Sequence, residues 1–131
     1  MAVIEHVAIF TSNTERLRIF YEKYFGGKSG PKYFNIETGL KSYTLMFEGS
    51  AKLEIMEKPD INIERPQACK GYSHLSFKVE SIEKVNELTT LIKKSGYGVR
   101  NYPRENSDGI YESCVYDPDG NEVEIMTQII N

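Results

Sequence analysis

Residues 120–126, Gly-Asn-Glu-Val-Glu-Ile-Met, repeat the pattern of residues 49–56, Gly-Ser-Ala-Lys-Leu-Glu-Ile-Met, with Glu-Ile-Met in register. A nearly equal interval separates His6 from His74 and Glu54 from Glu124. Self-similarity at a fixed period is the sequence signature of a repeated structural unit. The repeat therefore indicates that two copies of one module are fused in this chain.

The elements that precede each Glu-Ile-Met strand follow the same order. Helix caps are Ser12 or Asn13 in the first half and Ser81 in the second, and Gly26-Gly27 and Gly96 end the two helices. In the first half, the expected strands are 3–10, 33–36, 42–47 and 52–56, with the helix between the first two. In the second half, they are 72–79, 97–102, 110–116 and 122–129, again with the helix after the first. Each half reads as one βαβββ module of an α+β protein.

We expect the 131 residues to form one domain. Module 1 covers about 1–57 and module 2 about 71–131. The stretch between them, about 58–70, contains Pro59, Pro66 and several charges with little periodicity, and is predicted to be a linker.

Composition excludes several classes of function. The net charge is −3 and no block of Lys or Arg occurs, so neither nucleic acid nor an anionic membrane is an expected partner. Apolar runs are far shorter than the ~20 residues of a membrane span, and the first residues do not resemble a secretory signal. Cys69 and Cys114 are far apart and without a CxxC motif, which predicts reduced thiols in a cytoplasmic protein.

Alternation along the strands predicts where the polar side chains lie. In four strands the Val, Leu, Ile or Phe side chains can face the helix of their module, which leaves four polar residues on the other face: His6, Glu54, His74 and Glu124. Imidazole and carboxylate suit Zn²⁺, Fe²⁺, Mn²⁺, Ni²⁺ or Co²⁺. Four such ligands would either close a structural site or leave positions open for substrate. The alternative is that each is an ordinary polar residue on a sheet surface.

Five segments of the sequence resemble the vicinal oxygen chelate superfamily, which includes glyoxalase I, methylmalonyl-CoA epimerase, thiol transferases, extradiol dioxygenases and bleomycin-binding proteins. These segments are IEHVAIF, FYEKYFG, KLEIM, GYSHLSFKV and DPDGNEVEIM. The resemblance covers nearly the whole chain. It implies that the paired modules form a cupped, eight-strand mixed sheet around one divalent transition metal. It also implies a homodimer, in which modules are often exchanged between chains.

By this resemblance the metal ligands are His6, Glu54, His74 and Glu124, the set that glyoxalase I carries. The same resemblance implies that Glu124 acts as the catalytic base by detaching from the metal, with Glu54 assisting on the opposite side. Two positions depart from bacterial glyoxalase I, since Phe10 stands where that enzyme has Arg and Lys58 where it has Asn. Both missing residues help to hold glutathione, so the departures argue against glutathione as the thiol.

Six residues near the four predicted ligands are candidates for binding a small-molecule substrate. They are Phe10, Tyr43, Met56, Tyr72, Tyr111 and Glu112. The expected function is that of a metal-dependent lyase or isomerase of glyoxalase I type, acting on an α-hydroxycarbonyl or a thiol hemithioacetal through an enediolate. The alternatives are a thiol transferase or another metalloenzyme of the superfamily, and a non-enzymatic protein that binds or sequesters a small molecule.

Overall fold

The computed structural model describes residues 1–66, 68–106 and 108–129, and the chain divides into two compact units, Met1–Cys69 and Lys70–Asn131. Residue 67 of the expected linker and residues 107, 130 and 131 of the expected second module lie outside the described residues. The elements of the first unit are β1 (His6–Phe10), α1 (Thr14–Phe25), β2 (Lys28–Ser29), β3 (Tyr33–Phe34), β4 (Lys41–Met46) and β5 (Lys52–Glu57). Those of the second are β6 (His74–Lys78), α2 (Ile82–Lys94), β7 (Val99–Glu105), β8 (Ile110–Tyr116) and β9 (Glu122–Gln128).

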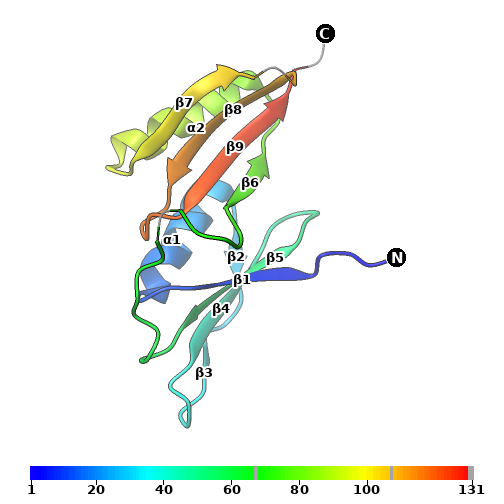
Figure 1. Cartoon of the computed structure of the whole chain (residues 1–131). Helices are drawn as coiled ribbons and strands as arrows, with labels where there is room; N and C mark the ends of the chain where they lie inside the picture. The colour runs from blue at the N-terminus through cyan, green and yellow to red at the C-terminus, as the bar shows by residue number, and fades with distance from the viewer. Residues whose placement is uncertain (67, 107, 130–131) are drawn as a thin grey trace. The chain divides into compact units, whose positions relative to one another are not determined.

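Each unit contains one mixed sheet, and the two sheets have the same strand order. In the first unit the order is β1-β5-β4-β2, with β3 also pairing with β4 (Figure 1). In the second unit it is β6-β9-β8-β7. The first and last strands of each unit are parallel neighbours, β1 with β5 and β6 with β9, and the remaining pairs are antiparallel. The predicted α+β class with two βαβββ modules is confirmed.

The strands of the first unit differ in detail from the expected ones. The expected strand 33–36 is the two-residue β3, and a further two-residue strand, β2, pairs with β4. Such short strands carry too few residues to give an alternation of polar and apolar side chains in the sequence. The described strands form two sheets, of five and four strands, and not the single eight-strand sheet that was expected.

Both helices begin at the polar residues that the sequence indicates. The Asn13 side chain accepts a hydrogen bond from the Arg16 backbone N–H, and Ser81 does the same for Lys84. These side chains satisfy amides that have no partner within the helix. α1 ends at Gly26, whose φ of 71° is a left-handed conformation that glycine adopts without strain.

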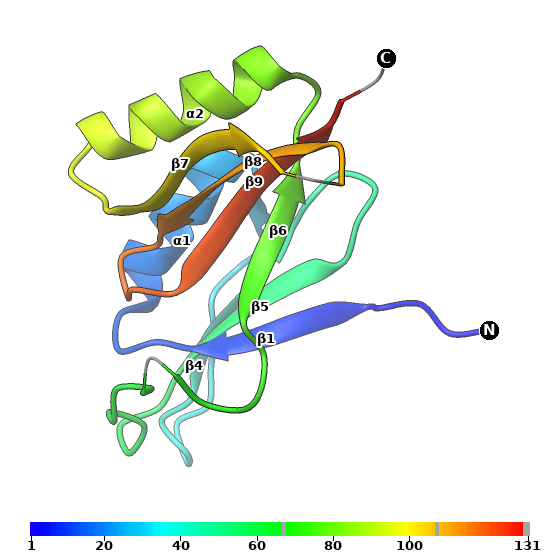
Figure 2. The same ribbon diagram turned by 45° about the horizontal axis from the view of Figure 1, so that its top comes forward.

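A helix covers one face of each sheet, as Figure 2 shows for α2 along the strands of the second unit. The core of the first unit comprises Leu17, Phe20, Tyr21, Leu45, Leu53 and Ile55, and that of the second Val85, Leu88, Ile92, Val115, Val123 and Ile125, all less than 9% exposed. Side chains of the other parity along the strands lie on the face away from the helix, which we call the open face of each sheet. In the part of the chain that the structure describes, no helix is long and apolar enough to cross a bilayer.

Candidate metal centre

The cross-strand register places one histidine and one glutamate at equivalent positions in both units. On β1, Ala8 is the partner of Glu54 on β5, and His6 precedes Ala8 by two residues. On β6, Ser76 is the partner of Glu124 on β9, and His74 again precedes by two. Residues two apart on a strand, and directly paired residues on neighbouring strands, point to the same face of a sheet. All four predicted ligands therefore lie on the open face of their own unit.

His6 and Glu54 form the first pair. Their Nε2 and Oε2 atoms are 3.8 Å apart, and the His6 side chain is 47% exposed. On the other side of the ring, Nδ1 lies 3.2 Å from a carboxylate oxygen of Glu5. Lys52 and then His6 hold the pKa of the Glu5 carboxyl below its usual range. In the tautomer that carries hydrogen on Nδ1, the Glu5 carboxylate accepts that hydrogen and the lone pair of Nε2 is left for a metal.

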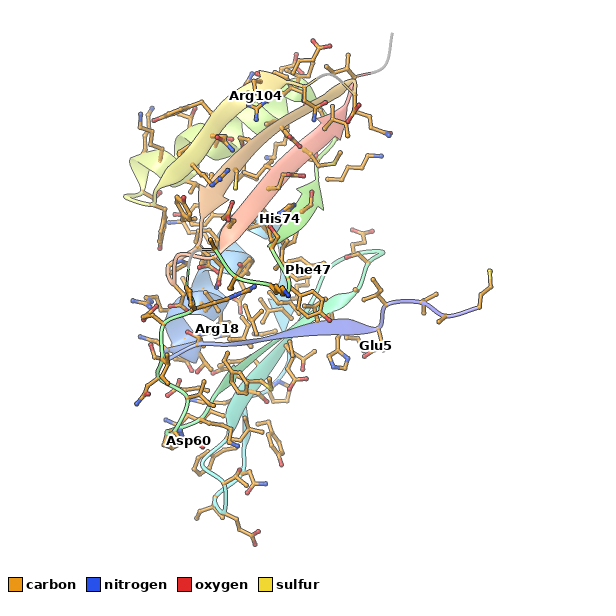
Figure 3. The ribbon with its side chains drawn as sticks, viewed as in Figure 1. Glu5, Arg18, Phe47, Asp60, His74 and Arg104 are labelled. Atoms are coloured by element: carbon orange, nitrogen blue, oxygen red, sulfur yellow. The ribbon has the colours of Figure 1, made fainter. Side chains whose placement is uncertain are left out.

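His74 and Glu124 form the second pair, at almost the same separation. Nε2 of His74, labelled at the start of β6 in Figure 3, is 3.6 Å from Oε2 of Glu124. The Ser73 hydroxyl lies 2.9 Å from Nδ1 of the same ring. The Ser76 hydroxyl donates to the other carboxylate oxygen of Glu124, Oε1, at 2.9 Å. Both oxygens of Glu124 therefore have an adjacent partner on β6.

The chemistry of these pairs fits a divalent transition metal. At bond lengths of about 2.0–2.2 Å, two ligands of one ion lie roughly 3.0–3.5 Å apart, so a small rotation of either side chain lets both atoms of a pair bind one ion. In both units Nδ1 has an oxygen partner, as is usual for metal-binding histidines. Among the described residues, no group of three or more His, Cys, Asp or Glu side chains is close enough to hold a metal by itself. Each unit therefore brings together two of the four predicted ligands.

Three of the predicted substrate-binding residues lie on the open face of their sheet, and a fourth is exposed to solvent. Phe10 and Met56 are direct cross-strand partners on the face that carries Glu54, and Phe10 is 47% exposed. Glu112 pairs with Met126 on the face that carries Glu124, and its carboxylate accepts a bond from Asn106 at 3.3 Å. Tyr72 precedes β6 and is 88% exposed.

The structure corrects the prediction that Tyr43 binds substrate, because Tyr43 lies on the helix-covered face of the first sheet. Its cross-strand partner is Ile55, which is fully buried in the core. The Tyr43 hydroxyl donates a 2.6 Å hydrogen bond to Glu15 on α1, and the Arg18 guanidinium stacks over the ring at 5.0 Å. A tyrosine fixed in this way to the helix cannot line the open face.

Tyr111 is corrected for the same reason. It pairs with Thr127, which is buried on the α2 side of the second sheet, and its hydroxyl donates to Asn86 of α2 at 2.7 Å. Tyr43 and Tyr111 thus tie a strand to the helix of their respective units. They stabilise the modules from the helix-covered face, opposite to the predicted ligands of their own unit.

Replacing Tyr43 by Phe is expected to destabilise the protein in a pH-dependent way. Hydrogen bonds from Tyr43 and then from Arg18 lower the pKa of Glu15 from 4.5 to about 2. A lowered carboxyl pKa stabilises the fold above pH 4.5, and this contribution is lost as the pH falls toward 2. The difference in unfolding free energy between wild type and Tyr43→Phe should be about 0.5–1 kcal/mol at pH 7 and should shrink on acidification, as measured by urea unfolding.

Tyr111→Phe is the matched control for this pH dependence. Its hydroxyl bonds to an amide that does not titrate, so its destabilisation should be similar at pH 7 and pH 3. Equal pH profiles for the two variants would contradict the role assigned to Glu15.

Cys114 lies beside Glu124 on the open face but is not suited to act as a nucleophile. It is the cross-strand partner of Glu124 and is 8% exposed. Burial, followed by the nearby Glu122 carboxylate, raises the pKa of the thiol to about 11. The thiolate is the reactive form of cysteine, so near neutral pH Cys114 stays protonated and behaves as a small packing residue.

Sequence reasoning did not find the residues that support the histidines. Glu5 and Ser73 both directly precede their histidine, so an oxygen-bearing side chain occupies the same place in both repeats. That correspondence is the signal that would have identified them. Ser76 has no such counterpart, because Ala8 occupies its position in the first unit.

Comparison with known proteins agrees with this duplicated architecture. The sequence profile of the Glyoxalase/Bleomycin resistance protein/Dioxygenase superfamily matches residues 3–125. The chain belongs to this superfamily. The uncharacterized protein YwkD of Bacillus subtilis (strain 168) is 34% identical over 88 residues, which are 65% of this chain and 68% of YwkD.

Solved structures of superfamily proteins have the same fold. A glyoxylase/bleomycin resistance protein/dioxygenase domain from Frankia sp. EAN1pec superposes with a TM-score of 0.83 at 18% identity, covering 98% of both chains. The trypanothione-dependent glyoxalase I of Leishmania major superposes with a TM-score of 0.76 at 22% identity, covering 97% of this chain and 87% of the enzyme. At these identities the likeness establishes the fold and not the reaction.

Proposed function

We propose that this superfamily member binds one divalent transition metal through His6, Glu54, His74 and Glu124. We further propose that it acts as a metal-dependent lyase or isomerase of glyoxalase I type. The substrate would be a small α-hydroxycarbonyl compound or the hemithioacetal of a thiol with a carbonyl compound. One observation carries the proposal: the two His–Glu pairs occupy the same register in both units, with nearly equal separations of 3.8 and 3.6 Å.

We propose a catalytic rather than a structural metal, which requires an ion that accepts more than four ligands. Two pairs that share one ion would provide four ligands, so a tetrahedral ion would have no position left for substrate, whereas an ion with six positions would keep two. A bound divalent ion supplies Lewis-acid stabilisation of the negative charge that develops when a carbon-bound proton leaves.

We also propose a cytoplasmic location, because Cys69 and Cys114 are both free thiols.

The side chains of the chain itself would handle the proton and the apolar part of the substrate. Glu124 accepts the carbon-bound proton and returns it to the neighbouring carbon, and Glu54 assists on the other side. Phe10 and Met56 form an apolar surface next to Glu54 on the open face. Because Phe10 provides no positive charge there, we expect a thiol other than glutathione.

The partner proposed for this chain is a second copy of itself. Since each unit supplies only two ligands, the pairs must meet either within one chain or across a homodimer with exchanged modules. Both arrangements give one ion per chain, so metal stoichiometry tests the ligand set whichever arrangement holds.

Metal binding is expected to be measurable on the purified, chelator-treated protein. Zn²⁺, Ni²⁺, Co²⁺, Mn²⁺ and Fe²⁺ are titrated separately, and one of them should bind at one equivalent per chain. At a free metal concentration of 100 times Kd, binding should stabilise the fold by about 2.7 kcal/mol, read as a rise in Tm. Turnover is then assayed with methylglyoxal and a panel of thiols, glutathione included.

The outcomes separate the candidate functions. Metal-dependent isomerisation of a hemithioacetal supports the proposal. A protein that binds the metal but transfers the thiol to an electrophile would be a thiol transferase. Absence of metal uptake together with tight binding of a small molecule would replace the proposal with a sequestration function.

A further inference from the structure

The two His–Glu pairs, which we call half-sites, differ at the position directly across from the glutamate on the strand that carries the histidine. Ser76 occupies it in the second unit and Ala8 in the first. Because the strands are parallel neighbours in the same register, a side chain at this position lies next to the carboxylate on the open face. This difference does not depend on whether the two pairs meet within one chain or across a dimer, because each half-site lies within one unit.

The two carboxylate oxygens of Glu124 have different neighbours, and Ser76 is the neighbour of one of them. Its hydroxyl donates to Oε1 at 2.9 Å, and Oε2 is the oxygen that lies 3.6 Å from His74 Nε2. A hydroxyl–carboxylate bond of this length restricts rotation of the carboxyl group. Oε2 is therefore directed to the side of the strand on which the His74 ring lies.

Glu54 has no such restraint among the residues that the structure describes. Its Oε2 approaches His6 Nε2 at 3.8 Å, and the methyl group of Ala8 offers no hydrogen bond to the other oxygen. The two carboxylates have similar exposure, 28% for Glu54 and 24% for Glu124, so solvation does not distinguish them. The serine does.

We infer that Ser76 is a positioning residue that fixes Glu124 as a metal ligand, and that the second unit is consequently the better-ordered half of the centre. This inference rests on the proposed function. Ligands held by hydrogen bonds to neighbouring groups bind metal more tightly, because less side-chain freedom is lost on binding. The histidines do not distinguish the two halves, because Nδ1 has an oxygen partner in both, Glu5 at 3.2 Å and Ser73 at 2.9 Å.

The test compares the metal affinity of three variants with that of wild type. Ser76→Ala removes the hydroxyl and should raise the Kd for Co²⁺ about 10-fold. Ser76→Thr keeps a hydroxyl on a residue that favours strands and should restore wild-type affinity. Ala8→Ser introduces a hydroxyl beside Glu54 and should lower the Kd a few-fold.

A spectroscopic readout separates positioning from a general structural effect. The visible absorption of bound Co²⁺ should change in Ser76→Ala and return in Ser76→Thr, whereas the Tm of the metal-free variants should stay near that of wild type. A Kd within twofold of wild type for Ser76→Ala, or weaker binding by Ala8→Ser, would overturn the role of the hydroxyl while leaving the ligand set intact. Failure of the wild type to bind any metal would overturn both the inference and the proposed function.

Discussion

Glu124→Gln is expected to lower metal-dependent turnover by about 100-fold to 10,000-fold, the usual contribution of a general base. An amide oxygen is not basic enough to take a carbon-bound proton, and it is a weaker metal ligand than a carboxylate. The fold should persist, because Glu124 lies on the open face and its side chain is 24% exposed. The free energy of unfolding of the metal-free protein should therefore change by less than about 1 kcal/mol.

Glu122→Gln is the control for this prediction. Glu122 lies on the same strand and the same face, two residues away and directly across from His74, but its carboxylate forms an ion pair with Arg100 at 3.1 Å. We expect this variant to keep its turnover. Turnover retained by Glu124→Gln in kcat assays with a saturating metal concentration would remove Glu124 from the role of base.

The duplicated architecture could be predicted from the sequence because its signal is local and occurs twice. Alternation in VIEHVAIF and YSHLSFKV places the histidines opposite the apolar residues, and the structure has this arrangement in both β1 and β6. The helix caps could be predicted for the same reason. Asn13 and Ser81 act on amides only three residues away, so no tertiary contact is needed to define them.

The faces of Tyr43 and Tyr111 could not be predicted, because their strands lack a clear alternation. On β4, Leu45 and Met46 are adjacent apolar residues, and only the pairing of Tyr43 with Ile55 determines which of them faces the helix. On β8, the polar Ser113 lies in the core. It is tolerated there because its hydroxyl bonds to Thr89 of α2 at 2.7 Å.

The carboxylate environments also depend on contacts between distant residues. Ser76 and Glu124 are far apart in the sequence and meet only through the β6–β9 register. The sequence therefore predicts which residues share a face, but not which of the two glutamates has a hydrogen-bonded neighbour.

Ile125→Ala is expected to lower the free energy of unfolding by about 2–5 kcal/mol. Ile125 is fully buried on the strand next to β6, with Phe77 and Ser113 as its cross-strand partners. Truncation removes apolar contacts and leaves a cavity that a close-packed core fills only partly. At roughly 3–5 °C per kcal/mol for a chain of this size, Tm should fall by roughly 6–25 °C.

Met126→Ala tests whether this loss arises because Ile125 faces the core, and not merely because it lies on β9. Met126 is the next residue and points to the open face with Glu112 as its partner, so its truncation should cost less than about 1 kcal/mol. Ile55→Ala, at the equivalent register of the first unit, should instead resemble Ile125→Ala, because Ile55 is also fully buried. Equal destabilisation by Ile125→Ala and Met126→Ala in thermal and urea unfolding would contradict the assignment of faces. The prediction of the four metal ligands rests on the same assignment of faces. Each ligand lies on the face that carries Met126 in the second unit or Met56 in the first, and not on the face that carries the core.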